Sequence, residues 1–206
     1  FELHKKVYQH EKNYFNCYES LFTDNHLVLL LIDPQSGAIV DANLAALSFY
    51  GYSKEEVLSK NINDINVLSE EEVNQEMKRA VREERNHFYF QHRLANGQIR
   101  DVKVHSGSIK VNNQELLYSA IHDITKQKRD EAEIKHLTFH DMTTNVYNRT
   151  YYWKVIPELN RPQNHPLSII MGDVNGLKLT NDVFGHKFGD KLLQEIARIF
   201  KDSIRE

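Results

Sequence analysis

Asp173 follows a short apolar run, residues 167–171, that we expect to form a strand. Ligands of α/β proteins gather at the carboxyl ends of strands, so an acid at this point suggests a binding or catalytic role. The simpler alternative is that Asp173 or Asn175 caps the helix that follows. A second carboxylate, Asp190, is expected in the first turn of a long amphipathic helix, where it would also favour the helix dipole.

Two other arrangements of metal-binding residue types occur in this region. Residues 173–176 begin like a calcium-binding loop, but that motif requires Gly where Lys178 stands and Glu where Phe184 stands, which excludes it. His136 and His140 are four residues apart and would share one face of a helix, yet no third ligand is evident beside them.

A larger set of residues in fixed order resembles the GGDEF family. The motifs that carry the resemblance are His140-Asp141, Thr144, Tyr147-Asn148-Arg149, Gly172-Asp173, Gly176-Leu177-Lys178, Asn181-Asp182, Phe184-Gly185-His186 and Gly189-Asp190. Members of this family condense two GTP molecules into cyclic di-GMP, using two divalent metal ions where two subunits meet. The resemblance therefore implies an α/β domain that binds GTP with Mg²⁺ or Mn²⁺ and acts as a homodimer.

The resemblance also implies a role for each matching residue. Asp173 would bind the metal through its carboxylate and Val174 through its backbone carbonyl, as suits a hard cation. Lys178 would offset charge on the phosphates during catalysis. The substrate-binding positions would be Asn181 and Asp190, which read the guanine edge, and His186. Taken singly, each residue also has a purely structural explanation, such as a solvated lysine or a turn.

Two departures from the family pattern bear on activity. None of the eight glycines is adjacent to another, so the Gly-Gly-Asp/Glu-Glu-Phe loop that names the family is absent from these 206 residues. We therefore expect the chain to be a GGDEF domain truncated before this loop, and inactive as a cyclase. Asn175 stands where many members carry a second Asp, and this variant resembles members that precede an HD-type phosphodiesterase domain.

The residues upstream predict a different kind of domain. Strands are expected at 27–32 and 38–40, a short helix at 44–50 between Asn43 and Gly51, and helices opened by capping boxes at Ser53 and Ser69. From residue 88 the pattern alternates with period two, and the pairs 96–97 and 112–113 are hairpin turn signals before a last strand at 116–124.

This order resembles the PAS fold, an α+β domain with a five-stranded antiparallel sheet and helices on one face. The supporting motifs are Ile39-Val40-Asp41-Ala42-Asn43, Ala45-Ala46, Gly51-Tyr52-Ser53, Asn96-Gly97 and Asp123-Ile124-Thr125. We expect an N-terminal helix at 1–24, the PAS domain at 25–125, a helical linker at 126–140 and the GGDEF portion at 141–206. The charged linker is expected to be a continuous helix rather than a solvated spacer. Such a stiff helix can pass a change of orientation from the PAS domain to the domain that follows.

The sensory ligand is not evident from the residues. A haem-binding PAS domain typically has a histidine on the helix near 69–85, and that stretch has none. A photoreactive flavin type requires a cysteine in the pocket, whereas Cys17 precedes the first strand. These observations argue against both cofactors and leave a small organic ligand, or a dimerising role without a ligand.

The bulk composition limits the remaining possibilities. A formal charge of −3 with 26 basic residues argues against a nucleic-acid partner. No apolar run is long enough to cross a bilayer, and a single cysteine suits a reducing cytoplasm. The chain begins at Phe1, so we expect a piece of a longer protein. Two functions remain: a sensor that regulates a diguanylate cyclase, or a PAS binding module with a non-catalytic, GTP-binding GGDEF-like domain that regulates a phosphodiesterase.

Overall fold

The computed structural model describes residues 19–82, 86–111 and 114–203. The chain divides into two compact units, residues 1–128 and 129–206, and each is described by itself. Most of the N-terminal helix expected at 1–24 lies outside the described residues. Within that range the structure has one short π-helix, η1 (Glu19–Thr23).

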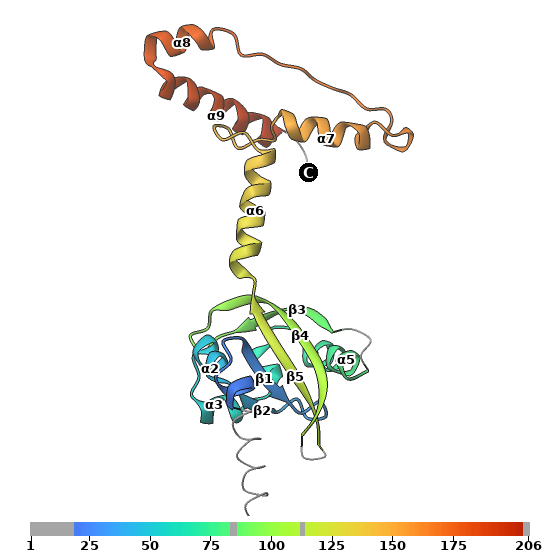
Figure 1. Ribbon diagram of the computed structural model, residues 1–206. Helices are drawn as coiled ribbons and strands as arrows, with labels where there is room; N and C mark the ends of the chain where they lie inside the picture. Colours follow the sequence, from blue (N-terminus) through green and yellow to red (C-terminus); the bar gives the residue numbers. More distant parts are fainter. Residues whose placement is uncertain (1–18, 83–85, 112–113, 204–206) are drawn as a thin grey trace, which may run out of the picture. The chain divides into compact units, whose positions relative to one another are not determined.

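The first unit is built on an antiparallel five-stranded sheet (Figure 1). Its strands are β1 (Val28–Ile32), β2 (Ile39–Ala42), β3 (His87–Arg93), β4 (Ile99–Val111) and β5 (Gln114–Asp123). They lie in the order β2-β1-β5-β4-β3, so β1 pairs with β5 in the middle of the sheet. The five antiparallel strands agree with the PAS-type fold expected from the sequence.

The period-two pattern of β3 has the expected structural meaning. Phe88 and His92 are buried while their neighbours face solvent, and Phe88 lies opposite Val104 of β4. The β3–β4 hairpin turns at Gly97, whose φ of 82° places it in the left-handed region that favours glycine. The β4–β5 hairpin pairs Val111 with Gln114, and its two turn residues lie outside the described residues.

Four short helices pack on one face of this sheet, and three of them begin where the sequence predicts. Asn43 caps α2 (Leu44–Tyr50), and capping boxes open α3 (Lys54–Leu58) and α5 (Glu70–Val81). A fourth helix, α4 (Ile62–Ile65), was not predicted. It has a capping box of its own, in which Asn61 and Asp64 bond each other's backbone N–H groups.

The two faces of β1 belong to two apolar clusters. Leu30 and Ile32 pack with the helices α2 to α5 in the main core. Leu29 and Leu31 face the other way, and they pack with Phe22 of η1. Alternating side chains in a strand point to opposite faces, so the continuous apolar run of β1 fits a strand covered on both sides.

The second unit is mainly helical. The linker helix α6 (Thr125–Phe139) agrees with the continuous helix expected at 126–140 and begins at the last residues of the first unit. It is followed by α7 (Arg149–Leu159), the short helix η2 (Pro162–Asn164), α8 (Leu177–Phe184) and α9 (His186–Ser203). Within the described ranges, no helix is long and apolar enough to cross a membrane.

The prediction of a strand at residues 167–171 is wrong. This segment has no regular secondary structure, and Ile170 and Met171 are 93% and 94% exposed. A strand is stabilised by hydrogen bonds to a neighbouring strand, and the described part of the second unit offers none. Apolar composition alone therefore does not make this segment a strand.

Candidate nucleotide site and sensory cavity

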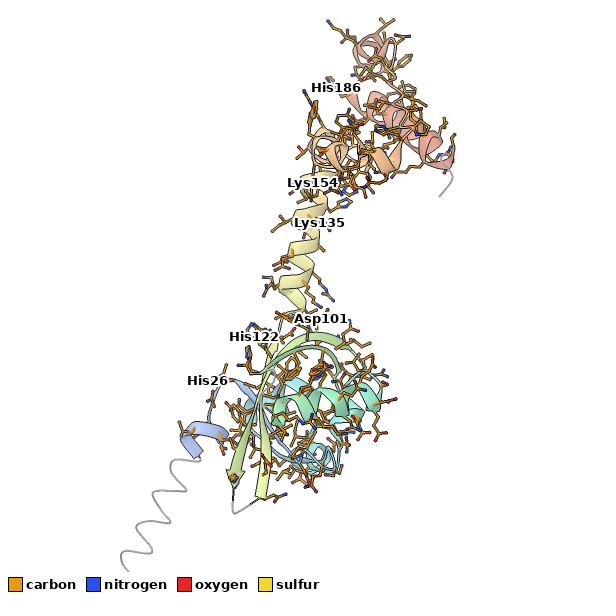
Figure 2. The ribbon with its side chains drawn as sticks, turned by 90° about the vertical axis from the view of Figure 1, so that its right-hand side faces the viewer. His26, Asp101, His122, Lys135, Lys154 and His186 are labelled. Carbon is orange, nitrogen blue, oxygen red and sulfur yellow. The ribbon has the colours of Figure 1, made fainter. Side chains whose placement is uncertain are left out.

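The predicted nucleotide-binding residues lie around a hairpin of two helices, α8 and α9. Gly185 joins the helices with φ 82° and ψ 157°, a conformation that is open essentially to glycine alone. His186 is the first residue of α9 and is exposed (Figure 2). Because α9 begins this early, Asp190 lies in its second turn, not in the first turn that the sequence predicted.

The two helices approach closely where Asn181 of α8 meets Gly189 of α9. A Cβ atom added at Gly189 would lie 1.8 Å from Asn181 Oδ1, so this contact requires glycine. Asn181 Oδ1 is buried and has no hydrogen-bond partner among the described residues. The amide oxygen therefore lies beside the residue that precedes Asp190, with its acceptor capacity unused.

Asp173 and Val174 precede α8, where Asp173 is exposed and Val174 is half-buried. The N-cap residue of α8 is Gly176, whose φ of 77° lies in the left-handed region. No side chain caps this helix. The alternative that Asp173 or Asn175 serves only as a helix cap is therefore wrong. Lys178 is exposed one turn before Asn181, and this spacing places both on the same side of α8.

A complete metal site is not present among the described residues. They contain no group of three His, Cys, Asp or Glu side chains that would hold a metal ion. The Asp173 carboxylate and the Val174 carbonyl are hard oxygen donors of the kind that Mg²⁺ prefers. They fit part of such a site.

The motif around Asp141 organises the chain between α6 and α7. Asp141 Oδ1 accepts hydrogen bonds from Thr144 N at 2.9 Å and from Thr143 N at 3.1 Å. The bonds from Thr144 lower the pKa of Asp141, because they stabilise the carboxylate. Asn148 caps α7 by accepting from Tyr151 N at 3.1 Å and donates to Thr138 O at 2.9 Å. These residues position the helices.

The histidine pair has no metal-binding geometry in the structure. The rings of His136 and His140 are stacked with centroids 4.1 Å apart, and His140 Nδ1 lies 3.1 Å from His136 O. The ring of His140 also packs on Tyr147 at 4.6 Å. This arrangement supports the structural role over the metal-binding alternative.

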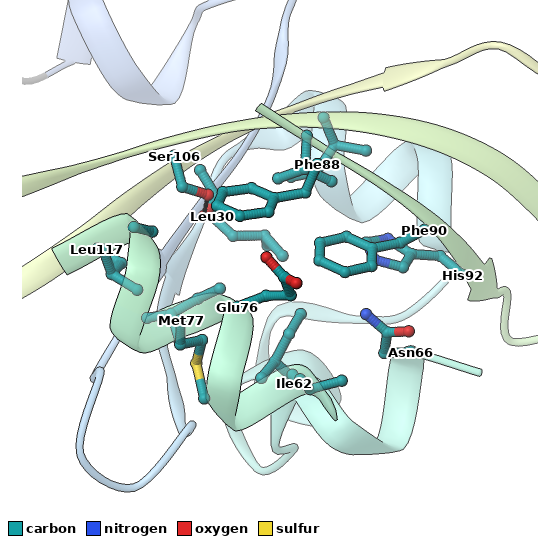
Figure 3. A pocket seen from close by; sticks show the side chains of 16 residues that line it. Leu30, Ile62, Asn66, Glu76, Met77, Phe88, Phe90, His92, Ser106 and Leu117 are labelled. Atoms are coloured by element: carbon teal, nitrogen blue, oxygen red, sulfur yellow. Dashed lines mark hydrogen bonds between the residues drawn. The ribbon is translucent and has the colours of Figure 1, made fainter. Parts of the chain in front are cut away.

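The first unit contains a cavity of about 40 Å³ between the sheet and α5 (Figure 3). At one end His92 Nδ1 and the Tyr50 hydroxyl form a buried hydrogen bond of 2.8 Å. Burial lowers the pKa of His92 to about 3 and raises that of Tyr50, so both groups are held neutral. This pair was not predicted from the sequence. The one indication was the alternating pattern of β3, which places His92 on the buried face of the sheet.

Comparison with family models now identifies both units. Residues 27–126 match the model of the PAS domain, and residues 138–206 match the model described as the diguanylate cyclase, GGDEF domain. The chain joins a PAS domain to a GGDEF domain. That this PAS domain binds neither haem nor a photoreactive flavin stays a prediction from the sequence.

Two of the relatives that the chain resembles are named as enzymes of cyclic di-GMP metabolism. The chain is 34% identical to diguanylate cyclase DgcM of Escherichia coli K12 over 97% of this chain and 49% of that protein. It is 32% identical to cyclic di-GMP phosphodiesterase PdeR of the same organism over 48% of this chain and 15% of that protein. The chain thus spans at most about half the length of these relatives.

Among solved structures, the PAS domain of an HTR-like protein from Haloarcula marismortui has a TM-score of 0.52 with this chain. Its sequence identity is 21%, and the match covers 58% of this chain and 99% of that one. At this identity the comparison supports the PAS fold and carries no information about the ligand.

Hydrogen bonds join the end of the PAS domain to the start of α6. Thr125 is 5% exposed, and its Oγ1 accepts from Asp101 N at 2.9 Å. Asp123 Oδ1 accepts from Thr125 N at 2.8 Å, and Lys128 Nζ donates to Asp101 Oδ1 at 2.8 Å. Asp101 lies on the sheet at the point where α6 begins (Figure 2). The first turn of α6 is thereby anchored to β4 and β5.

Proposed function

We propose that this chain belongs to a signalling protein of cyclic di-GMP metabolism, in which the PAS domain regulates a diguanylate cyclase-type domain. The observation that carries the proposal is the 34% identity to a diguanylate cyclase over 97% of this chain, across both domains. The catalytic activity, the conversion of two GTP into cyclic di-GMP, is assigned to the whole protein to which this sequence belongs.

In this proposal the α8–α9 hairpin binds GTP. Asn181 and Asp190 contact the guanine edge, His186 lies on the substrate side, and Lys178 offsets phosphate charge. The close approach of Asn181 to Gly189 supports this assignment, because it places the Asn181 amide beside the residue that precedes Asp190.

Asp173 and Val174 would hold Mg²⁺ or Mn²⁺ in the same site. When bound, such an ion polarises the α-phosphoryl group and lowers the pKa of the attacking 3′-hydroxyl. Asp173 is suited to this role because it is exposed and caps no helix.

The protein is proposed to act as a homodimer in the cytoplasm, since the reaction joins two GTP molecules held by two subunits. Its proposed organisation is an N-terminal helix at 1–24, the PAS domain at 25–125, a helical linker at 126–140 and the N-terminal portion of the GGDEF domain at 141–206. The hydrogen bonds of Thr125 support the linker as the path between sensor and enzyme, because they anchor the first turn of α6 to the sheet.

The test is an assay of cyclic di-GMP formation with GTP and Mg²⁺ or Mn²⁺. We expect turnover by the whole protein, and no turnover by the 206-residue chain, which lacks two adjacent glycines. Asp173→Ala in the whole protein should abolish turnover with an unchanged circular dichroism spectrum. If the whole protein makes no cyclic di-GMP with either metal, the proposal is wrong.

Two observations favour a second candidate, a non-catalytic GTP-binding domain that regulates a phosphodiesterase. Asn175 replaces an acid found in many cyclases, and the chain is 32% identical to a cyclic di-GMP phosphodiesterase over 99 residues. Saturable GTP binding by the whole protein without cyclic di-GMP formation, together with GTP-dependent hydrolysis of cyclic di-GMP, would select this candidate.

A further inference from the structure

The PAS cavity is mostly apolar. Figure 3 shows Leu30, Ile62, Met77 and Leu117 around it, with Phe88 and Phe90 on the sheet side. The rings of Phe88 and Phe90 are stacked at 5.8 Å, and those of Phe90 and His92 at 6.0 Å. Three parallel rings on β3 therefore form one wall of the cavity.

One charged group reaches into this apolar space, the carboxylate of Glu76 on α5 (Figure 3). Its Oε1 accepts a hydrogen bond of 2.7 Å from Arg79, whose side chain is 50% exposed. Its Oε2 is buried and has no partner among the described residues. A buried acceptor atom without a donor is unfavourable even when the other oxygen of the carboxylate is paired, so Oε2 can accept a hydrogen bond from a ligand.

Each of the other polar side chains that line the cavity makes at least one hydrogen bond. His92 Nδ1 is bonded to Tyr50, the hydroxyls of Ser106 and Ser119 bond each other at 2.8 Å, and Asn66 Oδ1 accepts from Leu68 N at 3.0 Å. Among the described lining residues, Glu76 Oε2 is the one buried side-chain nitrogen or oxygen atom without a hydrogen bond.

We propose that the PAS cavity binds a small organic amine, with its protonated amino group on Glu76 Oε2 and its apolar body against Phe88 and Phe90. An ionised carboxylate only accepts hydrogen bonds, so the ligand must donate, and an N⁺–H donor makes the stronger, charge-assisted bond. Aromatic faces also attract a cation. An anionic ligand would be repelled by Glu76.

The size of the cavity limits the ligand to a few non-hydrogen atoms. A buried water requires at least about 10–15 Å³ of such space, so 40 Å³ holds about three waters or a molecule of similar size. That the amine acts as a signal rests on the proposed function; its binding to the cavity does not.

The binding test uses the whole 206-residue chain labelled with ¹³C at its methionine methyl groups. Met77 lines the cavity, whereas Met142 and Met171 are 76% and 94% exposed in the GGDEF unit and serve as internal references. The chain is titrated with propylammonium, and in parallel with propanol and propionate, which have similar size but differ in charge. We expect saturable movement of the Met77 resonance with propylammonium alone.

Glu76→Gln keeps the shape of the side chain and removes its charge, and it should weaken propylammonium binding by about tenfold or more. Glu71→Gln, an exposed position on the same helix, is the matched control and should change the affinity less than twofold. Thermal melts of both variants report whether they fold.

Equal binding of propanol and propylammonium, no binding of any probe, or unchanged affinity in a folded Glu76→Gln variant would each overturn the proposal. Since none of these measurements involves cyclic di-GMP, the failure of the cyclase proposal would be seen separately.

Discussion

His92 is the residue whose protonation most directly couples the PAS core to pH. Its folded pKa is about 3, whereas an unfolded histidine titrates near 6.5. Below pH 6.5 the unfolded chain therefore binds a proton that the folded chain does not, and stability falls as pH falls. Above pH 6.5 both states are neutral at this position, and the effect disappears.

We expect His92 to reduce the free energy of unfolding by about 1.4 kcal/mol between pH 7.5 and pH 5.5. Urea unfolding at the two pH values measures this loss in the wild type and in His92→Gln, where the loss should be smaller by that amount. His122→Gln, an exposed position, should keep the wild-type pH dependence. An unaltered pH dependence in folded His92→Gln would contradict the assignment.

Asn43 is 1% exposed, and its side chain makes four hydrogen bonds that join three segments. Its Oδ1 accepts from Leu29 N and Ala46 N, and its Nδ2 donates to Asn25 O and Leu27 O, all between 2.7 and 3.1 Å. The same side chain thus caps α2 and holds the segment that leads into β1.

Asn43→Ala should destabilise the PAS domain by about 2–4 kcal/mol, since it removes a helix cap and leaves buried backbone groups unpaired. Chemical denaturation gives the value, and Asn74→Ala on α5 is the control, with a change expected below about 0.5 kcal/mol. A loss for Asn43→Ala no larger than for the control would contradict this role.

Among the elements, the start of α6 depends on the hydroxyl of Thr125. Thr125→Val keeps the shape but leaves Asp101 N without its acceptor, and should cost about 1–2 kcal/mol. Thr125→Ser keeps the hydroxyl and should cost less. Similar stability of the Val and Ser variants would rule out an anchoring hydrogen bond. In the whole protein, Thr125→Val should also reduce the response of cyclase activity to the sensory ligand.

The hairpin of α8 and α9 depends on Gly189. Gly189→Ala places a Cβ against Asn181 Oδ1, so Asn181 must move or the helices must separate. We expect GTP affinity in the whole protein to fall at least about tenfold, because a misplaced guanine contact loses a hydrogen bond. Gly172→Ala meets no atom within 4 Å and is the control. Retained GTP affinity in Gly189→Ala would remove Asn181 from the site.

At the scale of the whole molecule, the two units differ in how much they bury. All of β1 except Val28 is buried, whereas α7 and α8 bury no residue and α9 buries two, Gly189 and Ala197. Burial of apolar surface is the main source of stability. The GGDEF residues should therefore open more readily than the PAS sheet.

Hydrogen exchange followed by mass spectrometry tests this difference on the 206-residue chain. We expect amides of β1 and β5 to exchange at least about a hundredfold more slowly than those of α7 and α8. Similar protection in both units would show that the GGDEF residues have a core that the described contacts do not contain.

Much of the PAS domain was predictable from the sequence because its signals are local. The caps at Asn43 and Ser53 bond groups within three residues, and the alternation of β3 follows from the geometry of any strand. The order of these signals along the chain was sufficient to predict the PAS fold. The same holds for the motifs that match GGDEF domains, which lie in one continuous stretch.

The features that carry the site required the folded chain, because they join residues distant in sequence or lack a local signal. Tyr50 and His92 are 42 positions apart in the sequence. In the sequence Glu76 is one of several acids on an acidic helix, and only the folded chain shows that its Oε2 is buried at the cavity. Residues 167–171 have the composition of a strand but no partner among the described residues. Asp173, the candidate metal ligand, therefore precedes the turn at Gly176 and does not lie at the end of a strand.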